Sequence, residues 1–179
     1  MNKNALPAAA LALIFAAASA QAAGAPQARV GELVQTALGQ AQTTDLTGVS
    51  VDISGAATGL TVAADADAVL RTLKGVIEYS ARSMTGRTTR RLSIRIGRNG
   101  ANVDVELRDS GPGVAAEDLL KIYGGAPAPR SALALLSQSN RLAQSVGGRL
   151  LIDSEEGVGA DYLVELPLGK NTGETVAQR

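Results

Sequence analysis

The chain has 179 residues, of which 45% are hydrophobic and 19% charged, a globular rather than disordered composition with enough residues for one domain. Its 17 Lys and Arg residues balance its 17 Asp and Glu residues, and its aromatic residues are three Tyr and one Phe, so neither bulk charge nor base stacking favours nucleic-acid binding. The chain contains no Cys and no His, which excludes disulfides, thiolate metal sites, a Ser-His-Asp hydrolase and a phosphohistidine within this chain.

Residues 1–22 have the layout of a secretory signal peptide. A short basic opening precedes an uncharged run from Ala5 to Ala20, and Ala20-Gln21-Ala22 fits a cleavage site between small residues. We therefore expect a periplasmic or secreted protein in which residues 23–29 form a leader. Two alternatives remain open: an uncleaved segment would anchor the chain to a membrane, and a misassigned start codon would leave the protein in the cytoplasm.

The first half of the predicted domain alternates helix and strand. Apolar residues at helical spacing predict a helix over residues 30–41. Alternating apolar residues then predict a pair of strands, residues 49–53 and 60–62, joined by a turn between Gly55 and Gly59. Asp65 and Asp67 supply helix-start chemistry for a second helix that ends near Met84.

The second half contains two hairpins and two more helices. Residues 92–96 and 103–107 alternate around an Asn99-Gly100 turn, which predicts a hairpin. A short helix over residues 116–123 follows, then a helix capped by Ser131 and stopped by Gly147-Gly148, then a hairpin over residues 150–166. This order predicts an α+β fold over residues 30–168, a two-layer sandwich with a mixed sheet covered on one face by helices. Residues 169–179 read as a flexible tail.

One turn carries most of the functional signal. The alternating strand that ends at Leu107 runs into Arg108-Asp109-Ser110-Gly111-Pro112-Gly113-Val114. Asp109 stands at the strand end, and Gly111 and Gly113 allow a sharp turn that passes close to another group. By itself this pattern also fits a plain strand-to-helix turn.

The surroundings of this turn resemble the ATP-binding domain of sensor histidine kinases. That domain belongs to the superfamily (GHKL, HATPase_c or Bergerat fold) that includes DNA gyrase, heat-shock chaperones and mismatch-repair ATPases. Five stretches, in this order, carry the resemblance: Asp65–Leu70, Arg108–Val114, Gly147–Leu150, Asp153–Gly159 and Leu163–Leu168. The resemblance implies that Asp109 binds the adenine amino group and that Gly111 and Gly113 let the backbone approach the nucleotide. It also places Arg82 near the phosphates, although the favoured interpretation of Arg82 is a solvated cation near a helix end.

The resemblance fails on the metal and phosphate side. Tyr79 occupies the position of the family's magnesium-binding asparagine, with Gly75 one helical turn earlier. A phenol does not replace an amide oxygen as a magnesium ligand, and Tyr79 fits either a ring beside the triphosphate or a core tyrosine without a ligand role. Leu133 and Leu135 stand where the second glycine box has its glycines, and Ala160 stands where the family tends to have Ser or Thr near adenine. The segment between Val114 and Ser131 is also shorter than the usual ATP lid.

We therefore expect a degenerate relative of these ATPases. The favoured hypothesis is a non-catalytic exported binding or signalling module, with no catalytic residue, no metal site, a protein partner, and weak or no binding of adenine nucleotide. The alternative is a working ATP- and Mg²⁺-dependent module of a two-component-type system, whose partner supplies the phosphoacceptor histidine. A third hypothesis, a remnant with little selected function, is opposed by the intact alternation of every strand.

Overall fold

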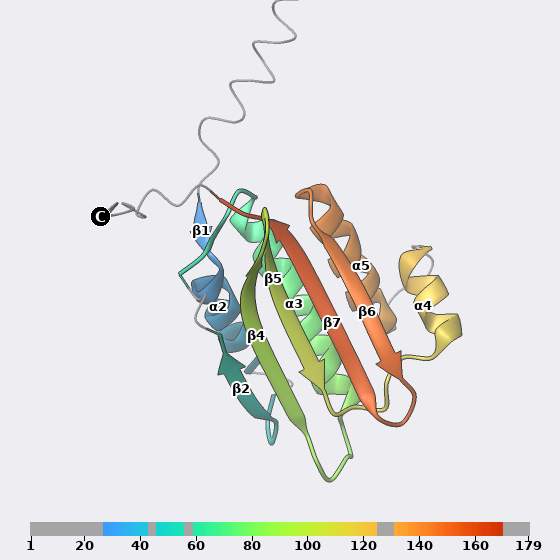
Figure 1. Cartoon of the computed structure of the whole chain (residues 1–179). Coiled ribbons are helices and arrows are strands. Elements are labelled where there is room, and N and C mark those ends of the chain that lie inside the picture. The colour runs from blue at the N-terminus through green and yellow to red at the C-terminus, as the bar shows by residue number, and fades with distance from the viewer. Residues whose placement is uncertain (1–26, 43–45, 56–58, 125–130, 170–179) are drawn as a thin grey trace, which may run out of the picture.

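The computed structural model describes residues 27–42, 46–55, 59–124 and 131–169. A five-stranded sheet has the strand order β2-β4-β5-β7-β6, and helices α2, α3 and α5 lie behind it in Figure 1. A second sheet consists of β1 and β3. The elements are β1 (Ala28–Arg29), α2 (Val30–Gln42), β2 (Ser50–Ser54), β3 (Thr61–Val62), α3 (Ala66–Ser83), β4 (Arg91–Asn99), β5 (Asn102–Asp109), α4 (Ala116–Tyr123), α5 (Leu133–Ser145), β6 (Arg149–Glu155) and β7 (Gly159–Pro167).

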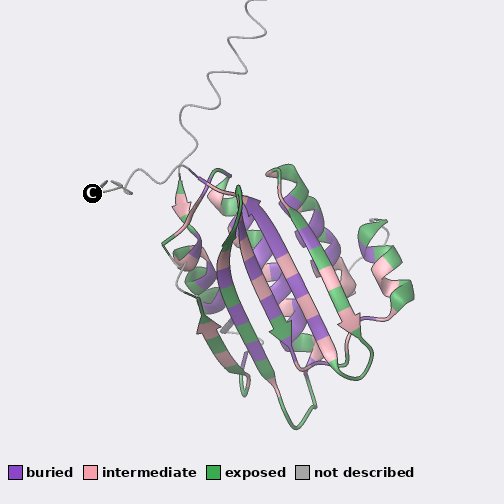
Figure 2. Cartoon of the chain, viewed as in Figure 1, coloured by how far each residue is buried: buried purple, intermediate pink, exposed green. Residues whose placement is uncertain are grey.

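The larger sheet is mixed, and the predicted fold class is confirmed. β2 is parallel to β4, whereas β4, β5, β7 and β6 pair antiparallel in that order. The helices cover one face of this sheet. Figure 2 shows buried residues alternating with exposed ones along β4 and mainly with partly buried ones along β5. The core therefore lies between the helices and the inward side chains of β4, β5 and β7.

The predicted strand pair at residues 49–53 and 60–62 is wrong. β2 pairs with β4, and β3 pairs with β1, whose residues Ala28 and Arg29 were assigned to the leader. The alternation of apolar residues identifies each strand but does not specify its partner. Here α3 connects β2 to β4 as a crossover between parallel strands, a pairing that a local hairpin pattern cannot indicate.

The two residues predicted to cap helices, Asp65 and Ser131, behave differently in the structure. Asp65 caps α3 as predicted, since its side chain accepts a hydrogen bond from the Asp67 N–H at 3.0 Å. Ser131 does not cap α5 with its side chain. The N-cap is Ala132, and the backbone carbonyl of Ser131 accepts the N–H of Ala134 in a tight turn that leads into the helix. The turn satisfies this N–H through the backbone, so no side-chain cap is required there.

Helices α3 and α5 pack closely at a glycine. A Cβ atom added at Gly75 would lie 2.3 Å from Ser139 Oγ and 3.3 Å from the Leu135 carbonyl oxygen. Ser139 Oγ donates to the Thr72 carbonyl oxygen across the two helices at 3.1 Å. The absence of a side chain at Gly75 therefore sets the distance between α3 and α5.

The two ends of the sequence lie largely outside this structure. The predicted signal peptide and most of the predicted leader and tail fall outside the described residues, while Gly169 donates to the Thr61 carbonyl oxygen at 2.8 Å. Among the residues that are described, no helix combines the length and apolarity that a bilayer crossing requires.

Candidate functional site

Asp109 is buried at the end of β5. Strand alternation points its side chain to the same face as Val105 and Leu107, toward the helices, and it is 5% exposed. Its Oδ1 accepts a hydrogen bond from the Gly111 N–H at 2.8 Å, and its Oδ2 accepts one from the Tyr162 hydroxyl at 3.1 Å. Each carboxylate oxygen therefore accepts a hydrogen bond from a group of the same chain.

Two tyrosines complete this buried cluster. Tyr162 lies on β7 directly opposite Leu107 of β5 and is 1% exposed. Its ring centroid is 6.2 Å from that of Tyr79, with an interplanar angle of 72°, an edge-to-face contact. Tyr79 lies on α3 and is also buried. We call Asp109, Tyr162 and Tyr79 the Asp109 cluster.

The two phenols of the Asp109 cluster remain protonated at physiological pH. Burial raises the pKa of Tyr79 to about 12, and the negative charges of Asp109 and Asp118 act in the same direction. Burial also raises the pKa of Tyr162, and the nearby negative charge of Asp109 acts in the same direction. Both residues therefore present neutral hydroxyl groups rather than phenolates.

The first glycine of the turn permits a close approach within the chain. A Cβ atom added at Gly111 would lie 2.7 Å from Ser83 Oγ and 2.8 Å from Asp109 Oδ1. The Gly111 N–H is the donor to that Asp109 oxygen, so a side chain would crowd the same contact. Gly111 thus fits tightly between the end of α3 and the Asp109 carboxylate.

The second glycine lets the turn pack on the β6–β7 hairpin. Gly113 has φ +80°, and a Cβ atom there would lie 2.6 Å from the Glu155 carbonyl oxygen. The neighbouring Val114 N–H donates to Ser154 Oγ at 2.7 Å, and the Gly157 N–H donates to the Pro112 carbonyl oxygen at 2.7 Å. The turn is therefore hydrogen-bonded to the hairpin on both sides of Gly113.

The remaining sequence-predicted positions do not join the cluster. Arg82 is exposed in the last turn of α3. Leu133 and Leu135, in the first turn of α5, are partly buried and pack against the hydrophobic core. Within the described ranges, no group of three or more His, Cys, Asp or Glu side chains is arranged to hold a metal ion.

Tyr162 is the residue that sequence reasoning missed. Its place in the alternation of the last strand marks it only as an inward-facing residue. Its contact with Asp109 arises from the antiparallel pairing of β5 with β7, between residues 53 positions apart. A polar ring among otherwise aliphatic inward positions of β7 was the one available signal.

Sequence comparison identifies the family. The model of the family described as "Histidine kinase-, DNA gyrase B-, and HSP90-like ATPase" matches residues 64–170, more than half of the chain. The chain belongs to this ATPase family. No curated protein matches the chain.

Solved structures agree with the assignment at the level of the fold. The mycobacterial sensor histidine kinase MprB superimposes with a TM-score of 0.68 and 14% sequence identity, covering 81% of this chain and 98% of that chain. A nucleotide-free form of the catalytic domain of histidine kinase ThkA gives a TM-score of 0.66 and 17% identity, covering 79% and 94% respectively. The fold of this chain is therefore similar to that of the two histidine kinase structures over nearly their whole length.

Proposed function

We propose that this member of the ATPase family is a non-catalytic binding or signalling module with impaired binding of Mg-ATP. The observation that carries the proposal is the hydrogen bond between Tyr162 and Asp109. A carboxylate that reads adenine must accept hydrogen bonds from the exocyclic amino group, whereas here both oxygens already have donors from the chain and the group is 5% exposed. Each oxygen keeps a second acceptor site, but a base could reach it only if the groups that bury Asp109 moved.

The residues around Asp109 do not fit a bound Mg²⁺ ion. The family implies ATP with Mg²⁺ for a working member. Mg²⁺ requires near-octahedral oxygen ligands at about 2.1 Å, usually carboxylates, phosphates and waters. The side chain at the position of the expected amide ligand is instead Tyr79, a neutral phenol whose pKa is raised to about 12 and whose ring packs on Tyr162.

The start of α5 also opposes phosphate binding. A helix N-terminus binds phosphate through bare backbone N–H groups. In α5 the N–H groups of Ala134 and Leu135 already bond the carbonyl oxygens of Ser131 and Ala132. The isobutyl groups of Leu133 and Leu135 lie in this turn and pack against the core. The turn therefore contributes to hydrophobic packing and offers an anion no polar side chain at these two positions.

We further propose that the protein acts outside the cytoplasm, with a protein partner. The signal-peptide layout of residues 1–22 supports export, and an exported domain has no cytoplasmic ATP supply. N-terminal sequencing of the protein from its native cell fraction tests this: a mature chain that begins near residue 23 supports export, and an intact Met1 in the cytoplasmic fraction contradicts it.

Calorimetry of the purified protein tests the nucleotide claim. We expect neither Mg-ATP nor Mg-ADP to bind more tightly than about millimolar. Adenosine alone, titrated in parallel, separates contacts to the base from contacts to the phosphates. The competing hypothesis, a working nucleotide-binding module, predicts saturable binding that requires Mg²⁺ and is lost in Asp109→Asn, and that result would overturn the proposal.

A further inference from the structure

The outer edge of the large sheet is formed by β6. Within the described residues β6 pairs with β7 alone, so one side of the strand is open to further hydrogen bonding. Successive residues of an antiparallel strand direct their backbone N–H and C=O groups to alternate sides. Ile152 directs its N–H away from β7, and Leu150 and Ser154, two positions before and after it, share that orientation. These three residues therefore make up the hydrogen-bonding edge of β6.

The segment that contains α4 contacts this strand near both of its ends. Before the helix, the Val114 N–H donates to Ser154 Oγ at 2.7 Å. In the last residue of the helix, Tyr123 Oη accepts the Ile152 N–H at 2.9 Å. The tyrosine hydroxyl therefore occupies the central donor of the β6 edge, which an added strand would need.

Helix α4 itself is weakly attached to the core. It buries one of its eight residues, Ile122, while Leu119 is partly buried and Leu120 is 77% exposed. A segment with few buried apolar contacts opens at a lower free-energy cost than the core does. The hydrogen bond of Tyr123 is therefore a substantial part of what keeps the end of α4 on β6.

The free edge of β6 is complementary to itself. If two copies of the strand pair antiparallel about Ile152, this residue faces its counterpart, and Leu150 of each copy faces Ser154 of the other. All three outward-directed residues are then used in both strands, which a shifted register does not allow. The centre of this pairing is the N–H that Tyr123 occupies.

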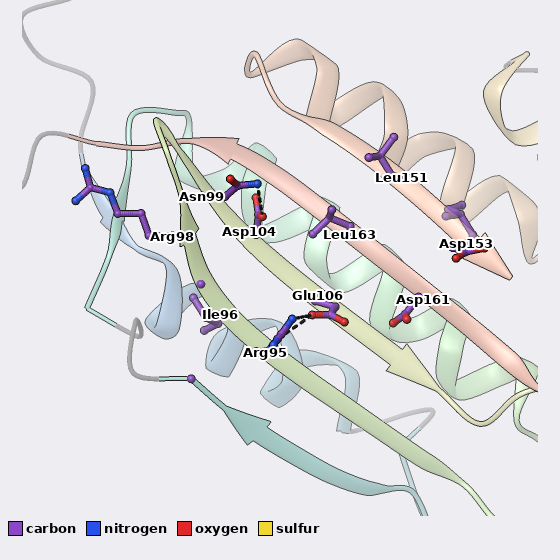
Figure 3. A pocket seen from close by; sticks show the side chains of 13 residues that line it. Arg95, Ile96, Arg98, Asn99, Asp104, Glu106, Leu151, Asp153, Asp161 and Leu163 are labelled. Atoms are coloured by element: carbon purple, nitrogen blue, oxygen red, sulfur yellow. Dashed lines mark hydrogen bonds and ion pairs between the residues drawn. The ribbon is translucent and has the colours of Figure 1, made fainter.

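The side chains on the open face of the sheet permit the same pairing. Figure 3 shows Leu151 and Asp153 on this face of β6, and in the register about Ile152 each would face the other residue type in the second copy. Like charges directly opposite each other destabilise a strand pair, and this register places none there. Arg149 already forms an ion pair with Glu165, so the backbone hydrogen bonds of the edge, not new ion pairs, supply the attraction.

We propose that Tyr123 blocks self-association of the protein through β6. Its hydroxyl holds the end of α4 on Ile152, and release of that contact frees the edge to pair with β6 of a second copy. Both copies must release α4 before they pair, so a change in the cost of release acts twice on the dimerisation constant. The contact lies outside the Asp109 cluster, and the proposal does not depend on whether nucleotide binds.

Tyr123→Phe tests the proposal in the full-length protein, because it removes the acceptor and keeps the ring. The loss of one neutral hydrogen bond should speed amide hydrogen exchange at Ile152 about two- to ten-fold, measured by NMR at a concentration where the protein is monomeric. Sedimentation equilibrium should show dimerisation strengthened about four- to 100-fold, the square of that effect. The control is Leu120→Ala, an exposed residue of α4, which should leave both measurements within about two-fold.

A second substitution locates the interface. Leu151→Asp, added to Tyr123→Phe, sets a carboxylate opposite Asp153 at two places in the dimer. The two like-charge pairs should weaken dimerisation about two- to 30-fold. Leu151 is 41% exposed on the open face, so its replacement leaves the core intact.

Three results would overturn the proposal. Unchanged exchange at Ile152 in Tyr123→Phe would show that the hydroxyl does not hold this edge. Faster exchange without stronger dimerisation would show that a second copy does not pair with the freed edge. Dimerisation of Tyr123→Phe that persists with Leu151→Asp but is lost with Leu120→Ala would assign the association to the exposed face of α4 instead of β6.

Discussion

Replacing Tyr162 with Phe tests the central contact of the candidate site. The substitution removes one hydroxyl and keeps the ring that packs on Tyr79 at 6.2 Å. It leaves Asp109 Oδ2 without its donor in a site where the two residues are 1% and 5% exposed, so water cannot readily replace the bond. A hydrogen bond to a charged group contributes about 1.5–3 kcal/mol, and we expect the free energy of unfolding to fall by that amount.

Thermal and urea unfolding of the two proteins measure this loss. For a domain of this size, the expected change corresponds to a decrease in Tm of about 3–12 °C. The matched control is Tyr79→Phe, which removes a hydroxyl from the same cluster. The Tyr79 hydroxyl makes no hydrogen bond within the described residues, so its removal should change stability by less than about 0.5 kcal/mol. Equal destabilisation by the two substitutions would refute the argument that Tyr162 satisfies the Asp109 carboxylate.

Two further predictions concern packing and pH. Gly75→Ala should destabilise the protein by about 1–3 kcal/mol, because the new Cβ would lie 2.3 Å from Ser139 Oγ. The control is Gly39→Ala in α2, where a Cβ meets nothing within 4 Å, so this substitution should stabilise the protein by about 0.5–1 kcal/mol. Equal effects of the two substitutions in chemical denaturation would contradict the close packing of α3 on α5. Stability should decrease as the pH rises from about 10 to about 12, because folded Tyr79, with its pKa raised to about 12, keeps a proton that the unfolded chain loses near 10. Urea unfolding across this range should show a shallower decrease for Tyr79→Phe than for the unchanged protein, and parallel curves would contradict the prediction.

The sequence was sufficient for the helices and the antiparallel hairpins because their signals are local. The stripe in residues 30–41 and the alternation around Asn99-Gly100 each depend on neighbours within a few positions, and the structure has α2 and the β4–β5 hairpin there. The partner of β2 could not be predicted in this way. Its pairing with β4 depends on α3 as a crossover, and its own alternation is equally compatible with a hairpin to residues 60–62.

The candidate site was predictable in part for the same reason. The Asp109 turn is a continuous motif, and its position at the end of β5 follows from the alternation before it. The donor to its second oxygen comes from β7, a strand 53 residues away, and nothing local to Tyr162 indicates that contact. The sequence singled out Tyr79 through the family resemblance, but its edge-to-face contact with Tyr162 required the packing of α3 against the sheet.

The glycines of the Asp109 turn illustrate why such a motif does not by itself identify a nucleotide site. Each has an intrachain reason to lack a side chain: Gly111 lies against Ser83 and Asp109, and Gly113 lies against the Glu155 carbonyl. A domain that had lost its nucleotide would still need both residues, because alanine at either position would clash with its own fold. Retention of the glycines is therefore compatible with loss of Mg-ATP binding. The discriminating residues are the ones without such a structural need for their polar group. Our proposal of impaired Mg-ATP binding places one of these, Tyr79, at the position of the family's magnesium-binding asparagine.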